Sequence, residues 1–443
     1  MHTKLTRPVR LGIMLFLIAV FCIAAPAIIL YTAGYRYDFK TQKIKQTGVI
    51  SIDVLPRSAA VFLNDVRIQK SLPIRLPNRA PGAYRLRIEA DGYKPWEKDI
   101  TVESKQTTYI RDVTLFKNAL PAAVLPADSS DADDAFFSAD GAYVLFLARE
   151  QDIYEITLLD LREKRETPIM RARQESSPAI DWSPFSPTAA IRTEENGVAN
   201  VRLLDARNPS AAAVFPVPVA GHIRMQWPRN PVAPSVFINE NETVIELSEN
   251  SRRSIGGASS SVWYVDEKRR LWQFDATAKT VSLGSENTIE NLFSLQHDLE
   301  DILDVNDERL IGKSQERVLN IPLATRDERA PTTVSAGNAR FNVATGEWLV
   351  WSPWELWTIY PDGNVELLNR TSDPVVSIVP LDEFGLLLLV TENKLLGFNP
   401  GYYVTHELFA GGNIEKIAAD VAERKIYFWG TVGTNRGLFE LEY

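Results

Sequence analysis

Residues 136–161 read FFSADGAYVLFLAREQDIYEITLLDL and join two apolar segments through short polar turns. AYVLFLA and DIYEITLLD are rich in the aliphatic and aromatic residues typical of strands. Ser138-Ala139-Asp140-Gly141 precedes them and has the residue types of a tight turn. The segment therefore predicts a first strand, a turn, and a second and third strand that pair as neighbours.

The same order of strands and turns recurs to the end of the chain. The third strand is the easiest to trace, and it occurs as DIYEITLLD from Asp152, VANVRLLD from Val198, ETVIELSE from Glu242, RLWQFD from Arg270, RVLNIPL from Arg317, ELWTIYPD from Glu355, KLLGFNP from Lys394 and GLFELEY from Gly437. A strand repeat spaced by about 40 residues is typical of a β-propeller. We expect a propeller of eight blades over residues 131–443, or of seven if the irregular stretch 287–333 merges with a neighbour.

The unit at residues 136–161 resembles the repeats of TolB-type and WD40-like propellers, in which an S-x-D-G turn joins the first and second strands. The chain lacks a regular GH…WD pattern, so the resemblance is to the broad fold type and not to WD40 proteins proper. Trp182 in DWSPFSP and Trp227 in QWPRNP stand near the start of their units. We expect both side chains to pack as wedges between neighbouring blades.

The last repeat ends at Tyr443 on its third strand, with no residues left for a fourth. A sheet in this state exposes an unpaired edge, which favours aggregation. The short apolar run Ala122-Ala123-Val124-Leu125 lies just before the first repeat. We predict that it fills the gap as a closing strand.

Residues 48–115 alternate apolar and polar side chains with period two, in VISIDVLP, AAVFLND, YRLRIEA, KDITVES and TTYIRDVTL. This pattern predicts strands with one buried face. Turn signals separate them, notably Pro81-Gly82 and Asp91-Gly92. The segment therefore predicts a small β-sandwich.

This module resembles the PEGA domain, a small β-module of bacterial and archaeal surface proteins. The residues that carry the resemblance are, in order, Gly48-Val49-Ile50-Ser51-Ile52, Pro56, Ala59, Val61-Phe62-Leu63-Asn64-Asp65, Leu72-Pro73, Pro81-Gly82-Ala83-Tyr84, Gly92-Tyr93 and Trp96. Ser58 and Asp65 stand where the family often has glycine. The resemblance implies an extracytoplasmic spacer or adhesion-like module without catalytic residues.

Residues 11–35, LGIMLFLIAVFCIAAPAIILYTAGY, form the longest uncharged stretch of the chain. About twenty apolar residues in a helix span a hydrocarbon core of roughly 30 Å. A cleaved signal peptide is the alternative, but the apolar run is longer than the usual h-region and continues past Ala25-Pro26-Ala27. We expect a retained single-pass anchor, with Cys22 as a small apolar residue inside it.

Basic residues lie on both sides of this segment, so the local charges do not choose an orientation. Long domains that follow an export-like signal are translocated largely regardless of such charges. We therefore expect the N-terminus inside the cell and the bulk of the chain outside it. The formal charge of −9 argues against a nucleic-acid partner, because such binding needs a basic surface.

These patterns divide the chain into five parts. They are a basic head and transmembrane anchor at 1–35, a juxtamembrane linker at 36–47, the PEGA-like sandwich at 48–117, a linker or closing strand at 118–130, and the propeller at 131–443. The predicted fold class is all-β, apart from the single N-terminal helix.

No catalytic, cofactor or metal site is predicted. The four histidines are scattered without ligand spacing, and no HExxH motif occurs. EWLVWSPWELWTIY places Trp351, Trp354 and Trp357 around a turn at Ser352-Pro353. These three tryptophans are the candidates for a ligand or partner surface, because exposed aromatic patches mark interfaces. Packing between blades is the interpretation that we favour for them.

Together these features favour a non-catalytic cell-envelope protein that is anchored in the membrane and binds a protein or a glycan through its propeller. The rival is an enzyme or accessory subunit whose active site is built from propeller loops. Convergent carboxylates on the channel axis would favour the rival, and a mixed aromatic and polar face would favour binding.

Overall fold

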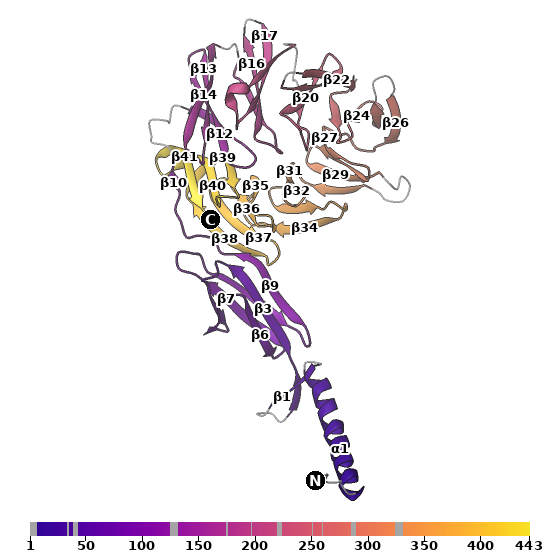
Figure 1. Cartoon of the computed structure of the whole chain (residues 1–443). Helices are drawn as coiled ribbons and strands as arrows, with labels where there is room; N and C mark the ends of the chain where they lie inside the picture. Colours follow the sequence, from indigo (N-terminus) through magenta and orange to yellow (C-terminus); the bar gives the residue numbers. More distant parts are fainter. Residues whose placement is uncertain are drawn as a thin grey trace, which may run out of the picture. The chain divides into compact units, whose positions relative to one another are not determined.

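The computed structural model describes residues 7–32, 35–38, 43–124, 132–173, 176–195, 197–218, 224–249, 251–258, 260–284, 289–323 and 331–443. The chain forms two compact units, Met1–Asn118 and Ala119–Tyr443, and each is described here by itself (Figure 1).

The first unit begins with helix α1, Arg7–Thr32. Its apolar part, Val9–Ile29, is the one helix of the described chain that is long and apolar enough to cross a membrane. None of this part is buried against the protein, as expected for a segment that lipid would surround. Such an N-terminal helix serves either as a single-pass anchor or as a signal peptide.

A short hairpin follows the helix, in the region expected to be a linker. Strand β1, Tyr35–Asp38, pairs antiparallel with β2, Lys43–Gln46. Gln46 Nε2 donates a hydrogen bond to the Tyr35 hydroxyl over 2.9 Å, and the Lys105 ammonium lies 4.9 Å from the centre of the Tyr35 ring. Tyr35 thus joins the hairpin to the loop before the last strand of the sandwich.

The rest of the first unit is the predicted sandwich. Its strands are β3 (Gly48–Leu55), β4 (Ala60–Leu63), β5 (Val66–Arg67), β6 (Ile74–Arg79), β7 (Gly82–Glu89), β8 (Trp96–Val102) and β9 (Thr107–Thr114). They form one sheet in the order β6-β3-β9 and another in the order β5-β4-β7-β8. The period-two pattern buries alternate side chains of β3, and Ile50, Ile52 and Trp96 belong to the core.

The turn between β4 and β5 explains one departure from the family pattern. Asn64 and Asp65 have φ angles of 50° and 62°, in the left-handed region that glycine usually occupies. Asparagine and aspartate are the side chains that tolerate this region best. The Asn64 side chain also accepts a hydrogen bond from the Arg85 amide over 2.9 Å, which fixes the turn.

The second unit is a β-propeller, and its described residues form eight four-stranded sheets (Figure 1). The first four are β11 (Ala132–Phe137) to β14 (Arg165–Arg173), with β12 (Tyr143–Glu150) and β13 (Ile153–Asp160); β15 (Ala179–Trp182), β16 (Thr188–Glu195), β17 (Val198–Asp205) and β18 (Ala213–Val217); β19 (Met225–Gln226), β20 (Ser235–Glu240), β21 (Thr243–Ser248) and β22 (Ser251–Gly257); and β23 (Val262–Val265), β24 (Leu271–Asp275), β25 (Thr280–Gly284) and β26 (Ile289–Ser294). A 3-10 turn, Pro209–Ala211, lies between β17 and β18.

The other four sheets complete the unit. They are β27 (Asp301–Val305), β28 (Arg309–Ser314), β29 (Arg317–Pro322) and β30 (Thr332–Ser335); β31 (Asn338–Asn342), β32 (Glu347–Trp351), β33 (Glu355–Ile359) and β34 (Val365–Arg370); β35 (Ser377–Pro380), β36 (Leu387–Val390), β37 (Lys394–Asn399) and β38 (Val404–Ala410); and β39 (Gly412–Asp420), β40 (Lys425–Val432) and β41 (Asn435–Glu442) with β10 (Ala122–Ala123). We call these sheets the first to eighth blades in chain order.

Two details of the predicted repeat can be compared with these sheets. The described part of the stretch 287–333 does not merge with a neighbour, because it supplies β26, the first three strands of the fifth blade and the start of its fourth. The prediction that RLWQFD forms a third strand is wrong. This segment forms β24, which is the second strand of the fourth blade. Second and third strands both end in a polar turn, so the local pattern of β24 fits either place.

In several blades, the turn between the first and second strands is held by a hydrogen bond from a backbone amide to a short polar side chain. In the first blade, the Ser138 hydroxyl accepts a hydrogen bond from the Tyr143 amide over 3.0 Å. Asp266, Asn306, Asn342, Asp382 and Asp420 accept amide hydrogen bonds in the equivalent turns of later blades. Short polar side chains favour such turns because they replace backbone acceptors.

The ring closes through the segment that precedes the first blade. β10 pairs antiparallel with β41, with Ala122 opposite Glu440 and Ala123 opposite Phe439. The Val124 amide continues the ladder by donating to the Leu438 carbonyl over 2.9 Å. The last blade therefore takes its fourth strand from residues that precede the first, whereas Leu125 of the predicted closing run lies outside the described residues.

Candidate binding site in the propeller channel

The first strands of the blades form the inner wall of the propeller. Neighbouring first strands contact one another, as β11 does with β15 and β39. Two cavities of about 960 and 950 Å³, called cavity A and cavity B, are lined largely by residues on or next to these strands. Asp181, Trp182, Pro184, Arg340 and Phe341 line both, so the cavities meet between β15 and β31.

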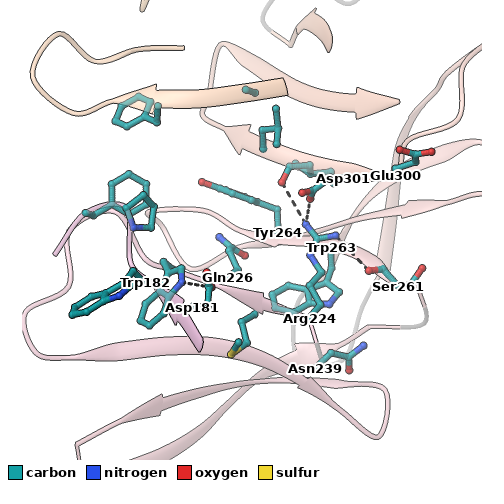
Figure 2. A pocket seen from close by; sticks show the side chains of 18 of the residues that line it. Asp181, Trp182, Arg224, Gln226, Asn239, Ser261, Trp263, Tyr264, Glu300 and Asp301 are labelled. Carbon is teal, nitrogen blue, oxygen red and sulfur yellow. Dashed lines mark hydrogen bonds and ion pairs between the residues drawn. The ribbon is translucent and has the colours of Figure 1, made fainter. Parts of the chain in front are cut away.

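An ion pair closes one side of cavity A. Arg224, just before β19, pairs with the carboxylate of Asp301 at the start of β27 (Figure 2). The Arg224 guanidinium also lies 5.5 Å from the centre of the Trp263 ring. Burial lowers the pKa of Arg224 and raises that of Asp301, while each partner opposes the effect on the other. The two charges compensate each other within the cavity wall.

Asp181 is the carboxylate that lies where the two cavities meet. Its Oδ2 accepts a hydrogen bond of 2.8 Å from the Trp227 indole (Figure 2). The Trp182 indole donates to the Phe136 carbonyl over 2.9 Å. Each tryptophan thus reaches the preceding blade, which agrees with the predicted wedges. Asp181 faces the channel, but the surrounding protein desolvates it and raises its pKa.

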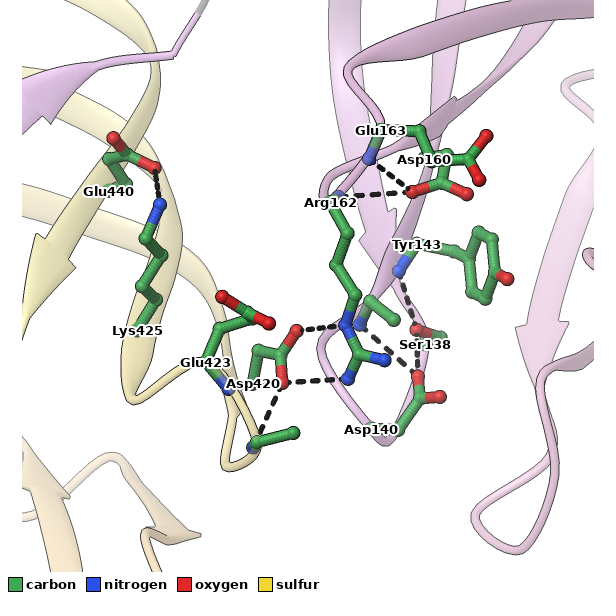
Figure 3. A network of polar contacts seen from close by, with 12 residues as sticks. Ser138, Asp140, Tyr143, Asp160, Arg162, Glu163, Asp420, Glu423, Lys425 and Glu440 are labelled. Carbon is green, nitrogen blue, oxygen red and sulfur yellow. Dashed lines mark hydrogen bonds and ion pairs between the residues drawn. The ribbon is translucent and has the colours of Figure 1, made fainter.

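Cavity B is bounded by a second ion pair, which joins the first blade to the eighth. Arg162 Nε and Nη2 donate to the two carboxylate oxygens of Asp420 over 2.5 and 2.8 Å (Figure 3). Asp420 is fully buried, and its Oδ1 also accepts the amides of Ala422 and Glu423. The hydrogen bond to Asp420 raises the pKa of Arg162, so the guanidinium stays charged.

Two other cations line cavity B without a described ion pair to a carboxylate. Arg340 on β31 donates from Nη1 to the Ile378 carbonyl on β35 over 2.9 Å. The Lys416 ammonium on β39 lies 5.4 Å from the centre of the Phe136 ring. Both residues line the cavity, and Arg340 lines cavity A as well. Cavity B therefore has positive charge that the described protein does not pair.

The rim of cavity B is apolar. Val343 and Phe384, in the turns after β31 and β35, are 58% and 64% exposed, and Val421, in the turn after β39, is also exposed. All three line the cavity. The turns of three consecutive blades thus place large apolar side chains in solvent around an opening, an arrangement that favours contact with another molecule.

The three tryptophans predicted as a binding surface take different positions. Trp351 is only 6% exposed, lies in the core between the sixth and seventh blades, and donates to the Val376 carbonyl. Trp357 packs against the neighbouring core and donates to Glu355 over 3.3 Å. Trp354 is 53% exposed at the turn. None of the three is among the described residues that line cavity A or B, and their role in binding stays a prediction.

Sequence reasoning missed the channel residues. Asp181 and Arg340 are single charges on first strands, and a single charge on a strand usually faces bulk solvent. The sequence feature that could have identified them is that each charged residue directly precedes an aromatic one, in Asp181-Trp182 and Arg340-Phe341. Within the described residues, no group of three histidine, cysteine or carboxylate side chains is placed to hold a metal ion.

Several solved structures are similar to the chain. One is the uncharacterized protein lmo1340 from Listeria monocytogenes, with 11% identity, a TM-score of 0.42, and coverage of 63% of this chain and 94% of that one. Apo AztD from Citrobacter koseri has 10% identity, a TM-score of 0.40, and coverage of 80% and 96%. The β-propeller domain of the Pyrococcus furiosus Trilobed protease has 11% identity, a TM-score of 0.36, and coverage of 82% and 96%.

Comparison of the sequence identifies the first module. No curated protein matches the chain. The model of the PEGA domain matches residues 47–118, which include every strand of the sandwich. The chain therefore joins a PEGA domain to a β-propeller.

Proposed function

We propose that this protein is a membrane-anchored, extracytoplasmic binding protein whose propeller channel takes up part of a partner molecule. The observation that carries the proposal is the meeting of cavities A and B on a wall of mixed aromatic and charged residues. Cavities of about 300–1,000 Å³ with a few polar groups among apolar ones are typical of binding sites. In this reading, the PEGA domain is a spacer between membrane and propeller.

A protein partner fits the site better than a glycan. Sugar rings bind to open aromatic faces, but the aromatic residues of the channel wall are largely engaged. Phe341 is covered by the Arg229 guanidinium at 4.2 Å, and the Trp182 indole holds the first blade. The exposed rim consists of Val343, Phe384 and Val421, whose side chains match apolar residues of a protein segment.

The experiment fills the opening of cavity B and leaves the fold unchanged. Ala344 is exposed, lines cavity B, and donates its amide to Asn342 in the turn. Ala344→Trp should therefore obstruct the opening. Ala278 is an exposed alanine in a similar turn at Asp275, and it is not among the residues described as lining the channel. Ala278→Trp is the matched control.

The detergent-solubilised full chain would be used to capture envelope proteins, and in parallel to probe an array of envelope glycans. We expect at least one protein that both the wild type and Ala278→Trp retain and that Ala344→Trp loses. If instead a glycan is bound by the wild type and by Ala278→Trp but not by Ala344→Trp, the channel is still the binding site, and the partner is a glycan and not a protein. Equal capture by all three chains would contradict the channel as the binding site.

The alternative function is an enzyme, and one observation favours it. Asp181 combines access to the channel with a raised pKa, as a general acid requires. Asp301 and Asp382 also have raised pKa values, but Asp301 is paired with Arg224, and Asp382 accepts the amides of its own turn. Asp420 is paired with Arg162. If the protein converts a captured ligand, Asp181→Asn should abolish turnover and leave capture intact; a ligand recovered unchanged from the wild type would count against this function.

The anchor and its orientation belong to the same proposal. Cys22 is the only cysteine of the sequence and lies within α1. A retained anchor therefore leaves one thiol in the denatured mature protein, and a cleaved signal peptide leaves none. Protease added to cells with a permeable outer layer should remove material beyond about residue 40; complete protection would reverse the proposed orientation.

A further inference from the structure

Arg340 differs from the other arginines that line the channel. Arg162 and Arg224 are each paired with a carboxylate, Asp420 and Asp301. Arg340 makes one described hydrogen bond, from Nη1 to the backbone carbonyl of Ile378 on the next blade. Its Nε and Nη2 have no described partner. The guanidinium is thus oriented by the protein and keeps donors for another molecule.

Five carboxylates line cavity B, and none of them, Glu383 included, has a described ion pair with Arg340. Asp140 accepts the Ser138 hydroxyl and Asp420 accepts Arg162. Asp382 accepts the backbone amides of its own turn, and Asp181 accepts the Trp227 indole. Each of these four groups is thus engaged with a donor other than Arg340.

A guanidinium in such a place calls for a counter-charge. Removing a cation from water is costly unless an anion replaces the lost hydration. The desolvation of Arg340 lowers its pKa, but arginine has so high a pKa that it stays protonated. Lys416 adds a second cation to the same cavity. The missing partner is therefore an anionic group that enters from outside the chain.

We propose that Arg340 binds a carboxylate on the protein segment that inserts into the channel, with Lys416 adding to the attraction and the apolar rim holding the flanking residues. This inference rests on the proposed function. A carboxylate fits because two parallel N–H donors of a guanidinium match its two oxygens. The rim of Val343, Phe384 and Val421 favours apolar residues on both sides of the acidic one.

The probe is a library of N-acetylated, C-amidated heptapeptides with glutamate at the centre and apolar residues elsewhere. A matched library has glutamine at the centre. A charged hydrogen bond contributes about 1.5–3 kcal/mol, so the detergent-solubilised full chain should prefer the glutamate peptides by about tenfold or more. Ala344→Trp should remove binding of both libraries, because it obstructs the opening.

Two variants of Arg340 separate charge recognition from folding. Arg340→Gln should bind both libraries equally, and Arg340→Lys should keep part of the preference because it keeps the charge. Arg207→Gln is the control, since Arg207 is exposed and pairs with Asp205 outside the channel. Each variant should melt within a few degrees of the wild type.

The outcomes distinguish this inference from the proposed function. Peptides that bind the channel without a preference for glutamate would overturn the role of Arg340 and leave the binding function standing. A preference that survives in Arg340→Gln would do the same. Failure of both libraries to bind, together with an acidic glycan that Arg340→Gln loses, would overturn the protein segment as the occupant. If no ligand depends on the channel, both proposals fail.

Discussion

The ion pair of Arg162 with Asp420 gives the sharpest test of how the propeller closes. The pair joins the turn after β13 to the last residue of β39, so it holds the first blade against the last. Asp420 is 0% exposed and the Arg162 side chain is 43% exposed. The perturbation is Arg162→Ala, which leaves a buried carboxylate without its cation.

The geometry sets the size of the effect. Loss of one partner of a buried ion pair costs about 3–5 kcal/mol. Asp420 keeps two backbone amides in the variant, and water can enter the half-exposed space of Arg162, so we expect about 2–3 kcal/mol. The combination Arg162→Ala with Asp420→Asn should be more stable than Arg162→Ala alone, because asparagine keeps the turn acceptor without a buried charge.

Thermal unfolding of the full chain measures this prediction. For a unit as large as residues 119–443, each kcal/mol shifts the melting temperature by roughly 1.5 °C, so Arg162→Ala should lower it by about 3–5 °C. Arg207→Ala is the control: Arg207 has the equivalent place in the second blade, but its pair with Asp205 is local, and the two side chains are 61% and 19% exposed. Such pairs contribute about 0–1 kcal/mol. Equal shifts for the two variants, or no rescue by Asp420→Asn, would refute the reasoning.

Three further predictions concern closure and the channel. Gly141→Ala should destabilise the ring, because Gly141 has φ +66° and an added Cβ would lie 2.4 Å from the Ala419 carbonyl oxygen; a melting temperature equal to that of the wild type would contradict this close contact. Deletion of residues 119–127 should expose the edge of β41 and promote association, measured by light scattering, whereas a monomer with unchanged melting temperature would show that the segment is only a linker. The pKa of Asp181 is higher in the folded state than its ordinary value of 3.8. Its contribution to the free energy of unfolding is therefore fully present below pH 3.8, and it is lost as the pH rises through the folded-state pKa. Asp181→Asn should therefore flatten that part of the pH dependence of the melting temperature, and identical pH profiles would contradict the shift.

The sequence determined the elements that depend on local pattern. Period-two alternation in residues 48–115 specified the strands of the sandwich, because one face of each sheet must be apolar. Most of helix α1 follows from the uncharged, largely apolar run that begins at Leu11. The repeat of apolar strands and polar turns specified the propeller, because each blade needs the same alternation of buried strand and exposed turn.

The tertiary structure decided what depends on contacts between distant residues. The strand order of the fourth blade was one such case, since second and third strands look alike until their partners are known. Another was the burial of Trp351, which depends on contacts with the seventh blade beside it. Hydrophobic pattern identifies a tryptophan as apolar, but it does not say which neighbour covers the ring.

The candidate site is decided almost wholly by tertiary structure. Asp181 and Arg340 lie far apart in the sequence, and the ring brings both to the place where the two cavities meet. Their chemistry depends on what surrounds them: an indole donor and burial for Asp181, and a missing carboxylate for Arg340. A sequence names each charge, but the free energy of that charge is set by its neighbours and by the water that the fold excludes.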